Sequence, residues 1–209
     1  MKKLIYFILL GSLLLLLGAC ESGGKFNMVN ETSFPIYASV HGGPIVTIPA
    51  QENREFKIDT DSQSFLTGEV SRTVAVKVKG ETFSLFDDYE NKDVDSTYVT
   101  IRAGKTTHAF LKPNKASIKI LNERPEKISL VEIRHISPST DYVVATLDID
   151  ILSGESFWYR VKPATLQDNY TYQVVLYLEG LEDPLVYSTT TVLGIDEQWV
   201  IHVEPPEII

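Results

Sequence analysis

Tyr170-Thr-Tyr-Gln-Val-Val-Leu-Tyr-Leu178 is the stretch that decides the fold class. The side chains at every second position would share one face, and they are Tyr170, Tyr172, Val174, Leu176 and Leu178. Successive side chains of a β-strand point to opposite faces, so such a run buries one face and leaves the other in water. Residues 74–79 and 199–204 alternate in the same way. We therefore predict that these three segments are strands and not helices.

Turn-forming residues separate the predicted strands. They occur together at Gly42-Gly43-Pro44, Lys112-Pro113-Asn114 and Glu182-Asp183-Pro184, among other places. Such clusters mark turns, and a spacing of roughly 8–12 residues between them is typical of a small antiparallel β-sandwich. We predict an all-β chain with an immunoglobulin-like architecture. The cysteine pair of true immunoglobulin domains is absent from the sequence, so this term describes the architecture alone.

The chain contains two sets of matching segments in the same order. Asn30-Glu31 matches Asn122-Glu123. Residues 48–58 also align without gaps on residues 151–161. A repeat of roughly 90 residues is longer than the usual solenoid repeats and implies two whole domains. We predict two tandem β-sandwich modules, which are residues 26–114 and residues 115–209.

The N-terminus begins with two lysines and continues with an apolar run from Leu4 to Leu17, interrupted only by a glycine and a serine. A helix needs about 20 apolar residues to cross a bilayer. The shorter run with a basic head predicts a secretory signal peptide. The residues that follow, Leu17-Gly18-Ala19-Cys20, resemble the lipobox of bacterial lipoproteins.

This resemblance implies a particular fate for Cys20, the only cysteine of the chain. In lipoproteins the signal peptide, here residues 1–19, is removed, and the cysteine carries acyl chains such as palmitate. Two or more acyl chains hold a protein stably on a membrane, whereas one does not. We expect a lipidated tether over residues 20–25. The protein would then be attached to the cell membrane or outer membrane of a bacterium, facing the periplasm or the exterior.

The charge of the chain limits its other partners. The net charge is −9, and it becomes −11 when Lys2 and Lys3 leave with the signal peptide. Nucleic-acid binding depends on the neutralisation of phosphates by basic residues, so we expect no nucleic-acid partner. Anionic lipid also attracts basic rather than acidic proteins. The acyl chains on Cys20 are therefore the expected means of membrane attachment.

The sequence shows no motif of a catalytic or cofactor site. The four histidines, His41, His108, His135 and His202, lack the spacing of a metal site. No Gly-x-Ser-x-Gly elbow and no glycine-rich phosphate loop are present. His108 and His202 lie at matching places beside apolar alternations, which predicts two solvent-facing histidines. We expect a protein that is not an enzyme and has no cofactor.

One acidic segment is a weak candidate for a calcium site. Its carboxylates belong to Asp87, Asp88, Glu90, Asp93 and Asp95. Ca²⁺ prefers oxygen ligands on a flexible loop, but the EF-hand pattern requires a glycine at its sixth position, and this segment has none. The alternative is a solvated loop whose charges keep a sheet edge from pairing, and the sequence favours it.

Trp158 is the candidate binding residue. It lies between Phe157 and Tyr159, and it corresponds to Glu55 of the first module. Alternation places Phe157 and Tyr159 on the core face and Trp158 on the solvent face. An exposed tryptophan can anchor a protein partner or stack on a sugar ring. Single exposed aromatic residues are also common on surfaces that bind nothing.

Three functions are compatible with these observations. The first is a non-enzymatic, membrane-anchored lipoprotein that binds a protein or a cell-envelope component, and a flat unpaired edge strand would favour it. The second is a carbohydrate- or peptidoglycan-binding module, which exposed aromatic residues clustered at one end would favour. The third and least expected is a hydrolase, which would need a cleft that joins a histidine to a carboxylate.

Overall fold

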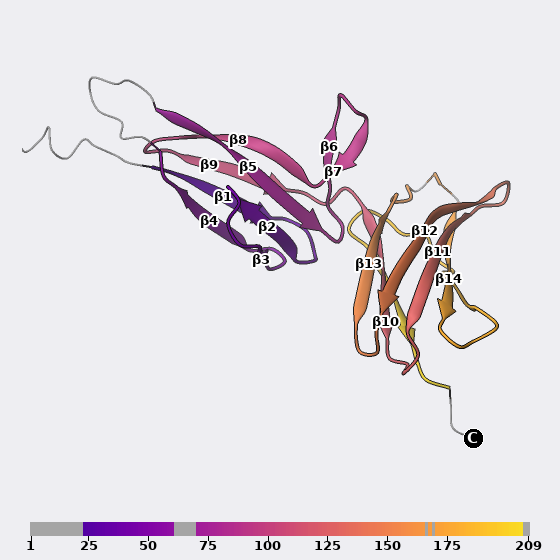
Figure 1. Cartoon of the computed structure of the whole chain (residues 1–209). Coiled ribbons are helices and arrows are strands. Elements are labelled where there is room, and N and C mark those ends of the chain that lie inside the picture. The colour runs from indigo at the N-terminus through magenta and orange to yellow at the C-terminus, as the bar shows by residue number, and fades with distance from the viewer. Residues whose placement is uncertain (1–22, 61–69, 166, 169, 207–209) are drawn as a thin grey trace, which may run out of the picture. The chain divides into compact units, whose positions relative to one another are not determined.

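The computed structural model describes residues 23–60, 70–165, 167–168 and 170–206, and all the regular structure within them is β-strand (Figure 1). The prediction of an all-β sandwich fold is confirmed. None of the described segments is a helix with the length and apolarity that a membrane crossing requires. The signal peptide predicted for residues 1–19 lies outside the described residues.

The chain divides into two compact units. The first contains Met1–Glu31, Pro35–Lys79 and Leu85–Lys112, and the second contains Thr32–Phe34, Gly80–Ser84 and Pro113–Ile209. Two short segments that precede residue 113 therefore pack with the second unit. The modules that we predict from the sequence, 26–114 and 115–209, place these segments with the first.

The first unit is a sandwich of two sheets with a small hairpin added. Its strands are β1 (Gly24–Asn30), β2 (Ile36–Val40), β3 (Val46–Ile48), β4 (Asn53–Ile58), β5 (Ser71–Gly80), β6 (Leu85–Asp87), β7 (Lys92–Val94), β8 (Ser96–Arg102) and β9 (Thr106–Leu111). One sheet has the order β4-β1-β9 and the other has the order β3-β2-β5-β8. Among the described strands, β6 and β7 pair with each other in a separate two-stranded sheet.

The second unit repeats this topology without the hairpin. Its strands are β10 (Ala116–Asn122), β11 (Ile128–Ile136), β12 (Asp141–Ile151), β13 (Ser156–Val161), β14 (Thr171–Leu178), β15 (Leu185–Ser188) and β16 (Gln198–Val203). The sheet orders are β13-β10-β16 and β12-β11-β14-β15. In each unit the first and last strands pair in parallel, β1 with β9 and β10 with β16. The remaining pairs for which a register is defined are antiparallel, as predicted.

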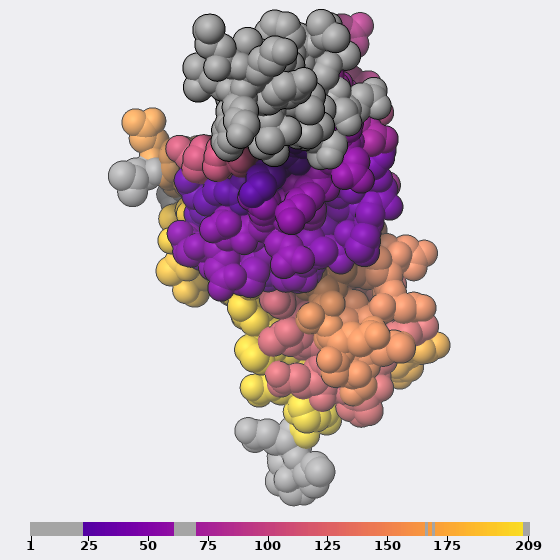
Figure 2. Space-filling view, turned by 90° about the vertical axis from the view of Figure 1, so that its left-hand side faces the viewer, coloured from indigo at the N-terminus to yellow at the C-terminus, as the bar shows by residue number. Residues whose placement is uncertain are grey.

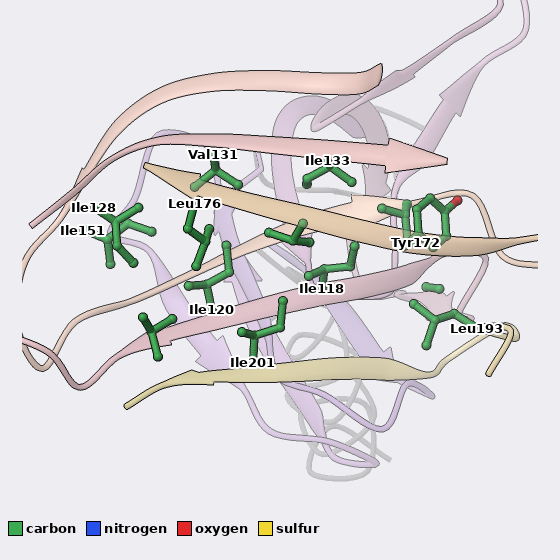
Figure 3. Close-up of a cluster of buried hydrophobic side chains, with 14 of the residues drawn as sticks. Ile118, Ile120, Ile128, Val131, Ile133, Ile151, Tyr172, Leu176, Leu193 and Ile201 are labelled. Carbon is green, nitrogen blue, oxygen red and sulfur yellow. The ribbon is translucent and has the colours of Figure 1, made fainter. Parts of the chain in front are cut away.

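The core of the second unit lies between its two sheets. Figure 3 shows Ile118, Ile120 and Ile201 pointing from one sheet toward side chains of the other, among them Val131 and Ile133. All five are at most 2% exposed. The alternation in the sequence places these side chains on the inner faces. Phe157 and Tyr159 also pack against this core, as predicted.

A buried asparagine at the end of the first strand joins the two sheets in each unit. Asn30 Nδ2 donates to Ile48 O at 3.1 Å and to Pro49 O at 2.9 Å. Asn122 Nδ2 donates to Ile151 O and to Glu126 O, both at 2.9 Å. Both asparagines are at most 1% exposed. The residues matched in the sequence thus make matching hydrogen bonds.

We predict that Asn122→Ala and Asn30→Ala each lower the free energy of unfolding by about 2 kcal/mol or more, because each leaves buried carbonyl groups without a donor. Thermal and denaturant unfolding of each variant measures the change. Asn53→Ala, at an exposed position of β4, is the matched control and should stay within about 0.5 kcal/mol of the parent. Equal effects at Asn53 and Asn122 would contradict the structural role.

Candidate functional site

The lipidation residue Cys20 lies outside the described residues. The structure does describe the end of the predicted tether. Strand β1 begins at Gly24, so the last two tether residues, Gly24 and Lys25, are part of the first sheet. Lys25 N donates to Lys105 O at 2.9 Å, and the Lys25 ammonium lies 3.1 Å from Glu55. Gly23 is also held by the first unit, because its N–H donates to Thr60 Oγ1 at 3.1 Å and its carbonyl accepts from Gly104 N at 2.9 Å. In the sequence, residues 21–23 lie between Cys20 and β1.

The acidic segment forms the hairpin of β6 and β7. Asp87 Oδ1 accepts hydrogen bonds from Tyr89 N at 2.9 Å and from Glu90 N at 3.1 Å, so this carboxylate closes the turn. Glu90 forms an ion pair with Lys92. Among the residues that the structure describes, no three His, Cys, Asp or Glu side chains are gathered as metal ligands. The five candidate carboxylates are therefore not assembled into a site.

Trp158 lies opposite Lys119 on the outer face of the sheet β13-β10-β16. The face is the one predicted, but the side chain is half-buried and not fully exposed. A neighbouring segment lies on the same face. Arg160, two residues along β13, donates from Nη1 to Phe83 O at 3.0 Å. The segment Gly80–Ser84 thus lies against the face that carries Trp158.

The segment Gly80–Ser84 is held on this sheet by a buried polar cluster. The Glu81 carboxylate is 2% exposed, lies 3.4 Å from Lys119 Nζ, and accepts a hydrogen bond from Gln198 Nε2. Thr82 Oγ1 donates to Asp196 Oδ1 at 2.6 Å. A buried carboxylate is stable only with such partners. Periodicity in the sequence gives no signal for this contact, because these partners lie from 38 to 117 residues away along the chain.

The second unit has one unusually long edge strand. Strand β12 contains 11 residues and ends its sheet, so one side of it has no partner strand among the described residues. Tyr142, Val143 and Val144 at its beginning are 53%, 44% and 37% exposed. Edge strands are usually short or protected by charges, because their free backbone groups can pair with another chain. The edge is not flat along its whole length, because its pairing with β11 has register shifts between Ile128 and Leu130 and between Ile133 and Arg134. Asp141, Asp148 and Asp150 add charge to it, so the apolar part of this edge is the stretch at Tyr142–Val144.

Aromatic residues fix the position of the beginning of β12. The ring of Tyr142 stacks on His135 of β11 with centroids 4.8 Å apart, and the tilted ring of Tyr170 has its centroid 4.1 Å from that of the same imidazole. Tyr172 OH donates to Lys162 O at 2.8 Å, and Tyr170 OH donates to the same carbonyl at 3.2 Å. Burial raises the pKa of Tyr172 well above its ordinary value, and it also raises the pKa of Tyr170.

We predict that stability falls steeply at alkaline pH because of these tyrosines. The folded state keeps Tyr172 neutral while the unfolded chain ionises near pH 10, so folding becomes less favourable as the pH rises above about 10. The slope is up to roughly 1.4 kcal/mol per pH unit for each tyrosine kept neutral. Denaturant unfolding between about pH 9 and 11 should show that the free energy of unfolding falls less with pH in Tyr172→Phe than in the parent. An exposed control, Tyr98→Phe, should retain the parent slope; a parental slope in Tyr172→Phe would contradict the assignment.

The four histidines are not brought together. His108 and His202 are exposed, as predicted, and His135 belongs to the aromatic cluster. His41 lies in a cleft of about 490 Å³ in the first unit, together with Glu55 and Asp59. No serine, threonine or cysteine is among the described residues that line this cleft.

Comparisons with known proteins identify distant similarities only. No family model matches the chain, and no curated protein does. The chain is similar to two solved structures from Bacteroides ovatus. One is a proposed cell adhesion protein, with 8% identity over 87% of this chain and 91% of that chain and a TM-score of 0.36. The other is a proposed adhesin, with 10% identity, coverages of 88% and 91%, and a TM-score of 0.29.

A third similar structure is the Bacillus anthracis TIE protein, with 10% identity over 88% of this chain and a TM-score of 0.29. The present chain spans about a third of that longer protein, 34% of its length. Likenesses at these identities and TM-scores support no conclusion about the function of this chain.

Proposed function

We propose that this chain is a membrane-anchored bacterial lipoprotein that is not an enzyme and binds a protein partner at the cell envelope. The anchoring rests on Leu17-Gly18-Ala19-Cys20 after the short apolar run. The protein partner rests on one structural observation, the long free edge of β12 with its exposed apolar residues. An extended segment of another protein can add to such an edge through main-chain hydrogen bonds.

The anchor keeps the first unit close to the membrane surface. Residues 21–23 between Cys20 and β1 span about 10–11 Å at most when fully stretched, since each residue spans roughly 3.3–3.6 Å. A protein held this way meets its partners within the envelope rather than in solution. We also propose that the chain consists of two tandem β-sandwich modules, residues 26–114 and residues 115–209.

We predict that Cys20→Ser abolishes membrane attachment. The parent should carry acyl chains on Cys20 and partition into the detergent phase, because two or more chains give stable anchoring. The serine variant should lack the mass of the acyl chains and move to the aqueous phase. Intact mass and detergent partition measure both effects. A serine variant with the parent's mass shift and partition would show that the anchor is elsewhere.

We predict that a photo-reactive side chain introduced at Val143 in β12 crosslinks to an envelope protein in living cells. The same group placed at Leu152, which is 51% exposed and lies just beyond the end of β12, should give little of that product. Tyr142→Lys should reduce crosslinking from position 143 at least tenfold, since a lysine on an edge strand opposes the addition of another strand. Mass spectrometry of the product identifies the partner.

Equal crosslinking at positions 143 and 152 would contradict binding at the β12 edge. The alternative function, carbohydrate or peptidoglycan binding, is favoured by exposed aromatic residues on the β6–β7 hairpin, where Phe86 is 53% and Tyr89 is 95% exposed. Retention on immobilised peptidoglycan that is lost in Tyr89→Ala or Trp158→Ala would support this alternative. Retention that is unchanged in both variants would exclude these residues as the sugar platform.

A further inference from the structure

The cleft of the first unit lies between the two sheets at one side of the sandwich. Residues 54–59 of β4 and the loop after it form one wall, and Val40, His41 and Val46 from the ends of β2 and β3 form the other. These segments form part of the purple surface of the first unit in Figure 2. Arg72 of β5 also lines the cleft.

The second unit explains why the first has a cleft. There β12 is 11 residues long, and its Ala145, Leu147 and Ile149 pack against the core together with Phe157 of β13. In the first unit the corresponding strand, β3, has three residues, and Arg54 occupies the position that matches Phe157. The inner face of β4 is therefore only partly covered: Ile58 is buried, Phe56 is half-buried and Arg54 is exposed.

Two arginines occupy inward-facing positions at this cleft. Arg72 is two residues before the buried Val74 on β5, and Arg54 is four residues before the buried Ile58 on β4. Residues two or four apart on a strand lie on the same face. With Lys57, three cations line the cleft, against the carboxylates of Glu55 and Asp59. Glu55 is paired with Lys25 at 3.1 Å. The local excess of positive charge contrasts with the net charge of −9 of the whole chain.

The Arg72 guanidinium is held in place by two hydrogen bonds. Nη1 donates to Asp59 O at 2.9 Å, and Nη2 lies 2.9 Å from His41 Nε2. A guanidinium has five N–H donors, so further donors remain for a ligand. An arginine fixed in this way loses little side-chain entropy when it binds a carboxylate through two parallel hydrogen bonds.

The turn that carries His41 is itself constrained. His41 and Gly42 have φ values of 55° and 73°, and Gly43 N donates to Val40 O at 3.0 Å, which is the pattern of a type I′ hairpin turn. His41 N also donates to Ala75 O at 2.8 Å. A side chain other than glycine in this conformation costs energy, and such residues often occur at binding sites. The turn holds the imidazole against Arg72.

The cleft also includes the free side of a strand. Strand β4 ends its sheet, so its outer backbone groups have no partner strand in the described structure. We propose that the cleft binds an extended peptide with a carboxylate: the peptide pairs with the free edge of β4, its carboxylate binds Arg72 and Arg54, and an apolar side chain packs on Phe56 and Val46. This site lies in a different unit from the β12 edge and does not depend on the function proposed above.

The test is a titration of the isotope-labelled full-length protein in detergent micelles with N-acetyl-Val-Ala-Val, observed by NMR. The peptide with a free C-terminal carboxylate should bind saturably, shift the His41 ring signals, and bind at least tenfold more tightly than the C-terminal amide. N-acetyl-Val-Ala-Glu amide distinguishes a side-chain carboxylate from a terminal one, and binding of either acid supports the site. Failure of both acids to bind at concentrations up to about 10 mM would overturn the proposal.

Variants separate this site from unspecific attraction. Arg54→Gln leaves the Arg72 hydrogen bonds in place and should weaken binding of the acid at least threefold, while Arg72→Gln should weaken it at least tenfold. Lys105→Gln removes the same charge at an exposed position of the first unit outside the cleft, and it should leave the affinity unchanged. Equal losses in Arg54→Gln and Lys105→Gln would overturn the proposal, as would competition by inorganic phosphate at the same concentration as the peptide.

Discussion

In both units, one buried amide side chain connects the two sheets of the sandwich. Asn30 and Asn122 end the central strand of a three-stranded sheet, and each donates to a carbonyl of the opposite sheet, Ile48 O or Ile151 O. The connection is supported by the main chain, where Asn30 N donates to Glu52 O and Asn122 N to Glu155 O. A buried amide must satisfy its donors, so this geometry fixes how the sheets meet and where the next hairpin turns.

The two units start from the same topology and differ in how their open sides are covered. The difference depends on the length of one strand, because β3 has three residues and β12 has eleven. A long β12 covers the core of the second unit and exposes an edge with apolar side chains. A short β3 leaves a cleft in the first unit, where Arg54 replaces an aromatic residue. Two different surfaces thus arise from one architecture.

The segment Gly80–Ser84 shows how a buried charge can determine which unit a stretch of chain joins. Glu81 is almost fully buried, and Lys119 and Gln198 surround its carboxylate. Water does not reach this covered sheet face, so the Glu81 carboxylate depends on these partners for its hydrogen bonds. Removing a partner while the segment stays in place would leave a buried charge unpaired, which is costly. The same segment bonds to Arg160 and Lys119 on the sheet face that carries Trp158, and the half-burial of Trp158 reduces its weight as an independent contact.

Alternating apolar residues and turn clusters were sufficient to predict an all-β sandwich, because side-chain alternation is a local property of strands. The matching of residues 48–58 with 151–161 likewise indicated a repeated fold. The alternation carries no information about the direction in which β1 and β9 pair or about which strand lies at an edge. Only the tertiary structure decides that Arg54, His41 and Arg72 line one cleft and that Glu81 lies beside Gln198. These contacts join residues far apart in the chain, and their geometry depends on how whole strands pack.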